Sequence, residues 1–211
     1  MRCIPFGEQQ QGEVNMVSKK TVRLAQLSIL TALIVVLQLL SYSIKIGPFG
    51  LSLVLIPIVI GGALFGVRSG AILGAVFGVV VVLCCMFGLD VGGNMLWSIN
   101  PLLTALICVV KGVAAGAAGA LVSTALQKAG KPTLGVFLSA VAVPLVNTGL
   151  FLVALSTFFY DTLVLWAAGQ NVVYYVLTGI ILVNFVPELL LNTILAPVAQ
   201  RVITAVRRSK I

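Results

Sequence analysis

Long apolar stretches separated by short polar segments make up the chain after Lys20. A membrane-spanning helix needs about 20 mostly apolar residues. The pattern predicts six such helices, over residues 22–44, 51–66, 68–88, 97–127, 133–159 and 171–205. The second is short, while the last three exceed the minimum and should tilt or project from the bilayer. We therefore predict an all-α membrane protein, a compact bundle of six transmembrane helices.

The connections between these stretches are too short to hold a soluble domain. Residues 21–211 are predicted to form one transmembrane domain, preceded by a polar tail over residues 1–20 that is compatible with disorder. The tail lacks an apolar segment followed by a cleavage site, so we do not interpret it as a signal peptide. Met16, just ahead of Lys19 and Lys20, is a second candidate start.

Composition supports the membrane assignment, and charge gives the orientation. Of the 211 residues, 60% are hydrophobic and 9% are charged, whereas soluble domains have about 25% charged residues. The net charge of +8 does not predict nucleic-acid binding, because the basic residues flank the helices. With the N-terminus inside, only Lys45 lies outside, and the inner ends hold Lys19, Lys20, Arg23, Arg68, Lys128, Lys131, Arg201, Arg207, Arg208 and Lys210. Both termini are therefore predicted to be cytoplasmic, in a bacterial plasma membrane.

Small residues recur at helical spacing. Glycines occur at every fourth position from Gly62 to Gly78, and the fourth predicted helix has Gly112, Gly116 and Gly119. Such spacing lets helix backbones approach closely in lipid, where no hydrophobic force drives helices together. Packing within the bundle is the favoured interpretation, and a docking face for another membrane subunit is the alternative. The first helix has a second small stripe at Ala25, Ser28 and Ala32.

Two ionisable residues, Lys111 and Glu188, lie deep in apolar stretches. A charge at membrane depth costs about 2.5–3.5 kcal/mol and usually faces a bundle interior or a polar cavity. From the helical rise, Lys111, Asn184 and Asn147 lie roughly 21, 20 and 18 Å from the outer ends of three helices, and Glu188 lies about one turn deeper. Polar groups from three helices at one level are what a solute site near the membrane midplane requires.

The partner of Lys111 has three interpretations. It could form a structural ion pair with Glu188, although such a pair stabilises weakly because desolvation offsets the attraction. It could contact an anionic group of a bound solute, or it could contact another subunit. Because Glu188 lies deeper, we expect it to orient Lys111 or to act on a partner subunit rather than to touch the solute.

Prolines accompany these polar residues. Asn184, Glu188 and Asn192 are spaced by four and share one helix face. Pro187 is predicted to interrupt that helix and free a backbone carbonyl, and Pro144 to do the same before Asn147 and Thr148. Loosened backbone at membrane depth is tolerated where protein or a cavity covers it.

The outer connections hold aromatic and amide side chains, including Trp97, Asn100 and Tyr174. An interfacial aromatic belt is the favoured interpretation. The alternative is the mouth of a pocket open to the outside, with residues 94–100 as its lid and these three side chains in contact with the solute.

Motifs for catalysis, metal binding and ATP hydrolysis are missing from the sequence. The chain has no histidine, and its four cysteines have no CxxC spacing, so no metal site is expected. It also lacks a phosphate-binding glycine loop and a nucleophile elbow. We predict no enzyme activity and no cofactor, and any uphill transport must draw its energy from a partner or an ion gradient.

Taken together, these residues resemble the substrate-binding S component of an energy-coupling factor (ECF) vitamin transporter. The resemblance covers nearly the whole chain after Lys20. It rests on the six spans, on Ala25, Ser28 and Ala32, and on the run GLSLVLIP at residues 50–57 leading into GGALFG at 61–66. Asn100-Pro101 opening the fourth helix and Lys111-Gly112 within it add to the likeness.

The resemblance implies capture of a vitamin at the outer side and three partners, a transmembrane coupling subunit and two cytosolic ATPases. It implies that the stripe of Ala25, Ser28 and Ala32 docks on the coupling subunit, with Ser28 standing where the family pattern has an alanine. The chain looks closest to the pantothenate, folate and riboflavin group, and a carboxylate suited to Lys111 favours pantothenate. The alternatives are a proton-coupled secondary carrier and a membrane scaffold without transport.

Overall fold

The computed structural model describes the backbone of residues 6–42, 45–46, 49–50 and 54–208, and the side chains of residues 20–42 and 54–208. Its elements, in chain order, are α1 (Phe6–Ser41), β1 (Lys45–Ile46), β2 (Phe49–Gly50), α2 (Leu55–Phe65), α3 (Val67–Met86), α4 (Val91–Ile99), α5 (Pro101–Lys128), α6 (Pro132–Phe158), α7 (Tyr160–Trp166), α8 (Val172–Tyr175), the π-helical η1 (Val176–Phe185) and α9 (Val186–Arg208). The two short strands pair antiparallel with each other.

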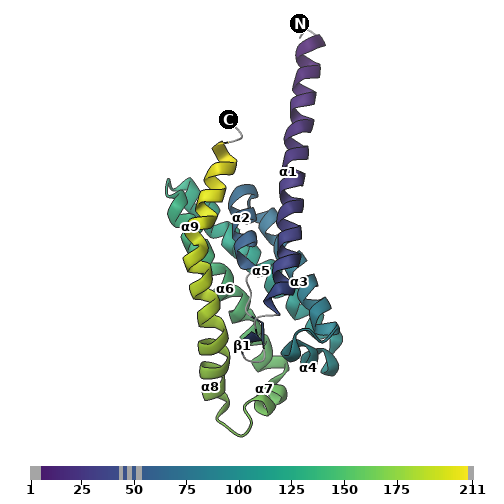
Figure 1. Ribbon diagram of the computed structural model, residues 1–211, viewed down its shortest axis with the longest axis vertical. Coiled ribbons are helices and arrows are strands. Elements are labelled where there is room, and N and C mark those ends of the chain that lie inside the picture. The colour runs from purple at the N-terminus through teal and green to yellow at the C-terminus, as the bar shows by residue number, and fades with distance from the viewer. Residues whose placement is uncertain (1–5, 43–44, 47–48, 51–53, 209–211) are drawn as a thin grey trace.

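The helices run along the long axis of the molecule and form a bundle (Figure 1). Five helical stretches are long and apolar enough to cross a membrane: residues 20–41 of α1, α3, α5, α6, and the continuous run from α8 through α9. The sixth apolar helix, α2, has only 11 residues. The prediction of an all-α membrane protein is confirmed, with α2 still shorter than predicted.

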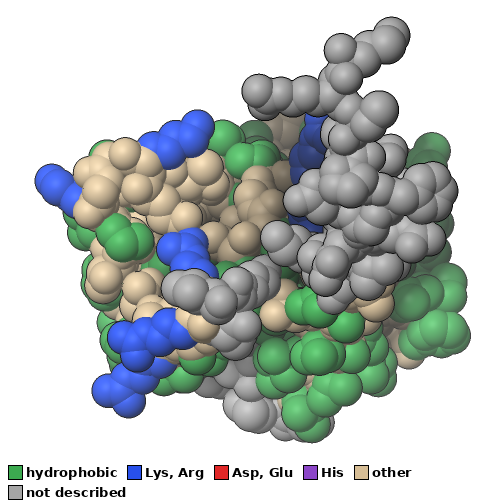
Figure 2. Space-filling view, turned by 90° about the horizontal axis from the view of Figure 1, so that it is seen from above, with side chains coloured by type: hydrophobic (Ala, Val, Ile, Leu, Met, Phe, Trp, Pro, Cys, Tyr) green, Lys and Arg blue, Asp and Glu red, His purple; other side chains and the backbone are tan. Residues whose placement is uncertain are grey.

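Both described ends of the chain lie at the same end of the bundle, and the first turns of α1 project beyond it (Figure 1). Figure 2 views that end: Lys and Arg side chains gather there, and no described Asp or Glu side chain is visible on that face. The arrangement agrees with the charge bias of the sequence. The boundary predicted at residue 20 stays a prediction, because α1 runs continuously across it.

The predicted fourth helix, 97–127, is corrected by the structure. Two helices occupy this region, and Asn100 separates them in an extended conformation. Its Oδ1 atom accepts a hydrogen bond from the Leu103 N–H at 3.1 Å, and Pro101 takes the first helical position of α5. Asn as a cap with Pro behind it favours a helix start at this point. Residues 94–99, predicted as part of a lid loop, instead belong to α4, which Asp90 caps.

The two prolines at membrane depth differ in their effect on the helix. Helix α6 continues through Pro144 without ending there. Before Pro187, by contrast, the chain follows a ten-residue π-helix, and ordinary α-helix resumes at Val186. π-Helical turns are rare in proteins and often occur at functional sites. The loosened backbone is therefore confirmed at Pro187, although it takes the form of wider turns rather than a break.

Glycines of α3 and α5 meet in a seam that holds the bundle together. Gly70, Gly74 and Gly78 of α3 lie against Gly116, Gly112 and Cys108 of α5, respectively. A Cβ atom added at Gly78 would lie 2.6 Å from the Cys108 carbonyl oxygen, and one added at Gly74 would overlap the carbonyl of Gly112. The predicted packing of small residues within the bundle is confirmed for this pair of helices, which we call the glycine seam.

The C-terminal end of α2 forms hydrogen bonds with α1, α5 and α9. Gly66 turns the chain there with a φ of +84°, which favours glycine. Arg207 of α9 and Gln127 of α5 both donate to the Ala63 carbonyl oxygen, at 3.1 and 3.2 Å. Arg23 of α1 donates to the Phe65 carbonyl oxygen at 3.4 Å and to the Ser69 hydroxyl of α3 at 3.1 Å. Cationic and amide donors at a helix C-terminus satisfy carbonyls that the helix leaves unpaired.

Candidate solute site

A cavity lies inside the bundle next to the glycine seam, bordered by Phe77 of α3 and by Cys108 and Lys111 of α5. It leaves about 60 Å³ for the centres of water-sized spheres, and one water needs about 10–15 Å³ by the same measure. Its polar lining residues are Gln38, Tyr42, Asp90, Thr104, Lys111, Asn147, Thr148, Asn184 and Glu188, and its apolar and thiol lining includes Phe77, Cys85, Leu96, Ile107, Cys108, Phe151 and Ile180. The lining thus offers polar side chains beside apolar ones, with hydrogen-bonding groups from several helices.

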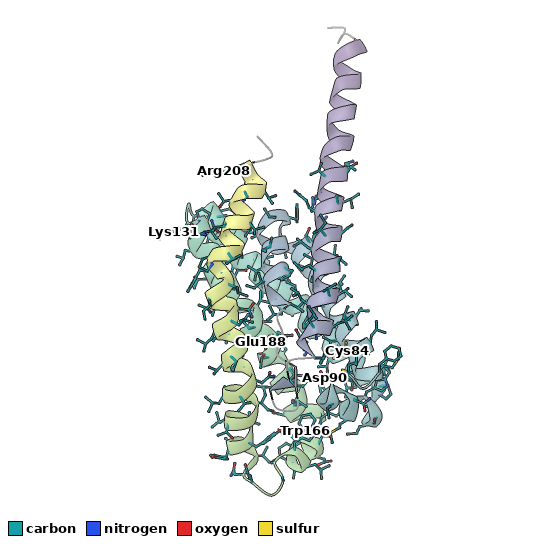
Figure 3. The ribbon with its side chains drawn as sticks, viewed as in Figure 1. Cys84, Asp90, Lys131, Trp166, Glu188 and Arg208 are labelled. Atoms are coloured by element: carbon teal, nitrogen blue, oxygen red, sulfur yellow. The ribbon has the colours of Figure 1, made fainter. Side chains whose placement is uncertain are left out.

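The polar residues predicted to share one level do come together. Lys111 of α5, Asn147 and Thr148 of α6, and Asn184 of η1 all line the cavity. Glu188 of α9 lines it as well, so the expected turn of extra depth does not remove this carboxyl group from the site. In Figure 3, Glu188 and Asp90 lie between the end marked by Lys131 and Arg208 and the end marked by Trp166.

Lys111 contacts an aromatic ring rather than the carboxylate predicted as one possible partner. Its Nζ atom lies 4.5 Å from the centre of the Phe151 ring on α6. Cations over aromatic faces are attracted by the ring's electron density. In the part of the chain described, no ion pair joins Lys111 to Glu188, which removes the structural ion-pair interpretation for this structure. The ring could not be paired with Lys111 from the sequence, because Phe151 is one of several aromatic residues at similar depth.

Four buried acceptor oxygens of the lining lack a hydrogen-bond donor among the described residues: Gln38 Oε1, Asn147 Oδ1, Asn184 Oδ1 and Glu188 Oε1. They come from α1, α6, η1 and α9, so four segments contribute. Leaving a buried polar atom unpaired costs about 1–3 kcal/mol. Proteins rarely leave such atoms together, and a group of them at a cavity indicates a site for a polar partner.

The face shared by Asn184, Glu188 and Asn192 is only partly at the cavity. Asn192 does not line it; its Nδ2 atom donates to the backbone carbonyl of Glu188 at 2.8 Å. That bond spans one helical turn inside α9 and holds the backbone beside the carboxyl group. Glu188 itself is only 3% exposed. The sequence spacing thus predicted two of the three positions at the cavity.

The sequence did not predict the chain of hydrogen bonds at one edge of the cavity. Gln38 Nε2 donates to the Tyr42 hydroxyl at 2.9 Å, and that hydroxyl donates to Asp90 Oδ2 at 3.3 Å. Asp90 Oδ1 accepts from the Gly93 N–H at 3.0 Å. Gln38 has an apolar sequence neighbourhood and Asp90 follows α3, so only the packing of α1 against α3 reveals that they meet. The one sign of this hydrogen bond in the sequence was the amide of Gln38 four residues before Tyr42.

Burial raises the pKa of the Asp90 carboxyl group, which lies between α3 and α4. The Gly93 N–H, the Lys111 ammonium and the Tyr42 hydroxyl oppose that effect. Burial also raises the pKa of the Tyr42 phenol, with the nearby Asp90 charge adding to it. The phenol therefore stays protonated and acts as a donor to Asp90.

Three predicted contact residues lie away from the cavity lining. Trp97 is half-buried on α4 and packs against the main hydrophobic core. Asn100 is exposed and caps α5. Tyr174 is 58% exposed on α8. None of the three is among the residues that line this cavity.

Two outward surfaces accompany the site. On α1, the predicted docking residues Ala25, Ser28 and Ala32 are all exposed, so the stripe faces away from the bundle. Between α5 and α6, an apolar groove of about 260 Å³ is lined by residues such as Leu106, Val110, Leu150 and Val153, and Ile107 and Lys111 border both the groove and the cavity.

Comparison of the sequence with models of known protein families gives one match. The family model described as "ECF transporter, substrate-specific component" matches residues 22–199, which run from within α1 to within α9 and include the whole cavity lining. No curated protein and no solved structure matches the chain.

Proposed function

Because the chain belongs to the family of substrate-specific components of ECF transporters, it is a substrate-binding membrane subunit of an importer and not an enzyme, and we propose that it captures a vitamin or a related small molecule from outside the cell. The solute binds in the cavity between Lys111, Asn147 and Asn184, with Glu188 and Thr148 beside it. Both termini face the cytoplasm of a bacterial cell.

The observation that supports this proposal most is the group of unpaired buried oxygens at the cavity. In a membrane the alternative partners of such atoms are scarce, so their free energy cost is tolerated where a ligand satisfies them. The side chains come from α1, α6, η1 and α9, and residues of α3, α4 and α5 complete the lining. A bound solute would therefore connect several helices of the bundle.

The cargo is best tested on purified protein. We expect native mass spectrometry to find one B vitamin or vitamin precursor retained after purification in detergent, at submicromolar affinity. Pantothenate, folate and riboflavin are the first compounds to add back, with pantothenate favoured by the sequence because its carboxylate could meet Lys111. A protein that retains no compound and takes up none of the B vitamins would contradict the proposal.

Two lysines of α5 provide a matched comparison for the site. Lys111→Met removes the ammonium at the cavity, whereas Lys128→Met makes the same change at the exposed end of the helix. We expect the first variant to lose roughly tenfold or more in cargo affinity, because hydrogen bonds to charged groups are the stronger ones, and the second to bind as the unaltered protein does. Equal affinities would remove Lys111 from the site.

We propose that the subunit delivers its cargo together with a transmembrane coupling subunit and two cytosolic ATPases, and that Ala25, Ser28 and Ala32 form the docking face. The exposure of all three residues supports this role, because small side chains let a second helix approach closely. Ser28→Trp should abolish co-purification with the coupling subunit while leaving cargo binding intact. Leu121→Trp, at a 56% exposed position of α5, is the matched control and should assemble normally.

A self-sufficient carrier makes the opposite prediction. Liposomes that contain this chain alone should take up no cargo, and uptake should require the ATPases. Uptake by the chain alone, abolished by an uncoupler, would instead favour proton-coupled transport through Lys111 and Glu188.

A further inference from the structure

The charges around the cavity do not balance. Its lining includes two carboxyl groups, Asp90 and Glu188, and one ammonium group, Lys111. The two carboxyl groups differ in how the protein satisfies them. Asp90 accepts hydrogen bonds from Tyr42 and from the Gly93 N–H, whereas Glu188 Oε1 has no donor among the described residues. The lining carboxyl group with an unmet acceptor oxygen is therefore Glu188.

The ammonium group of Lys111 is already engaged. It lies over the Phe151 ring at 4.5 Å, and it forms no ion pair with Glu188 in the described structure. Asn184, one helical turn before Glu188, adds a second buried oxygen without a donor. Two neighbouring positions of one helical run thus present acceptors to the cavity.

The hydrogen-bond chain at the cavity edge fixes the direction of a third acceptor. The Tyr42 hydroxyl has one proton and gives it to Asp90, so its oxygen must accept from Gln38. Gln38 therefore directs its Nε2 atom toward Tyr42, and its Oε1 atom is left without a donor. Gln38 is only 3% exposed, so its side chain faces the cavity interior rather than bulk water.

We infer that the cargo presents a cationic or donor-rich nitrogen group, such as an ammonium, amidinium or amino-heteroaromatic group, to the acceptors at Glu188, Asn184 and Gln38. This inference rests on the proposed function and names the chemistry of its substrate. Positive charge on the cargo pairs with the unmet carboxyl group, and its N–H groups satisfy the amide oxygens. A cargo whose only charge is a carboxylate would bring no positive charge to Glu188, so this inference disfavours pantothenate, the compound that Lys111 alone would favour.

A pair of small probes with the same planar shape tests the inference. Acetamidinium has four N–H donors and a positive charge, whereas acetate has two acceptor oxygens and a negative charge. Both fit a cavity with room for a few waters. The thermal unfolding midpoint of the purified protein is measured against the concentration of each probe, with sodium chloride keeping the ionic strength constant.

We expect acetamidinium to raise the unfolding midpoint with an apparent Kd roughly tenfold or more below that of acetate, since hydrogen bonds to an ionised partner are the stronger ones. Glu188→Gln should weaken acetamidinium binding by a similar factor. Asp161→Asn is the matched control, because Asp161 is exposed on α7 and does not line the cavity; its response should equal that of the unaltered protein. Asn184→Ala serves as a second variant, with a smaller loss, should Glu188→Gln not fold.

Equal shifts from the two probes, a larger shift from acetate, or no shift from either would overturn the inference, as would full acetamidinium binding by both Glu188→Gln and Asn184→Ala. These outcomes are separate from the test of the proposed function. A protein that retains a vitamin in native mass spectrometry but prefers acetate still captures a solute, and only the assigned chemistry of that solute is then wrong.

Discussion

The glycine seam and the cavity lie on neighbouring parts of α5 but are built in opposite ways. Along the seam, Gly112 and Gly116 bring the α5 backbone against that of α3, and no side chain separates the two. At the cavity, Lys111 and Cys108 of the same helix border open space. The seam leaves no room for a side chain between the two backbones, whereas the cavity is an open space bordered by polar side chains.

The contrast shows how a small membrane protein tolerates a costly site. Lipid tails are as apolar as the helices, so close backbone packing must supply much of the association energy. The seam provides that packing, and the unpaired oxygens of the cavity reduce stability by about 1–3 kcal/mol each. Binding sites of this kind are often less stable than the scaffold could make them.

The largest effect on stability is expected from a substitution that disrupts the glycine seam. Gly74→Val adds a branched side chain where even a Cβ atom would overlap the Gly112 carbonyl. We expect the unfolding free energy to fall by about 3 kcal/mol or more, because neither backbone can move aside without moving its helix. The measurement is the thermal unfolding midpoint in detergent. Gly149→Val makes the same substitution in α6, where nothing lies within 4 Å of the added Cβ, and a similar loss there would show that the seam is not special.

The second-largest effect on stability is expected at the edge of the cavity. Tyr42→Phe removes the hydroxyl group that links Gln38 to Asp90 and leaves both without this partner. We expect a loss of about 1–3 kcal/mol in unfolding free energy, the cost of buried polar atoms left unpaired. Cargo affinity should fall as well, since Gln38 is no longer held in place. An unchanged unfolding midpoint would mean that this edge of the cavity is satisfied in some other way.

A smaller effect is expected from the loss of a single hydrogen bond between α5 and α6, away from the cavity. The Ser139 hydroxyl of α6 donates to the Gly119 carbonyl of α5 at 2.7 Å and is fully buried. Ser139→Ala should lower the unfolding free energy by about 1 kcal/mol and leave cargo affinity unchanged, because hydrogen bonds between membrane helices are individually modest. Unfolding curves and cargo titrations of the same preparation check both parts, and reduced cargo affinity would argue that the two regions are coupled.

The smallest effect concerns pH. The pKa of Asp90 is raised above its ordinary value of 3.8 by burial, so the folded protein binds this proton more tightly than the unfolded chain. Its contribution to stability is therefore present at low pH and is lost as pH rises from about 3.8 through the raised pKa. Asp90→Asn should remove this part of the pH dependence of the unfolding midpoint. Parallel pH profiles for the two proteins would contradict the role of Asp90.

Local patterns in the sequence predicted the spans, the small-residue contacts and the depth of Lys111, Asn147 and Asn184. Each follows from the rise and periodicity of a single helix, together with the free energy cost of polar groups in lipid. The predicted fourth helix, residues 97–127, ran across Asn100-Pro101, where α4 ends and α5 begins. Apolar composition alone does not mark a one-residue break, although an Asn cap followed by Pro favours a helix start there.

Only the tertiary structure decided which polar groups meet. The sequence by itself placed Lys111 and Glu188 at membrane depth, but the rotation of α5 against α6 put the ammonium over Phe151 and left the Glu188 oxygen unpaired. The packing of α1 beside α3 joined Gln38 and Tyr42 to Asp90. Periodicity within one helix fixes which side chains share a face, whereas the angle and offset between helices depend on the packing of all faces at once.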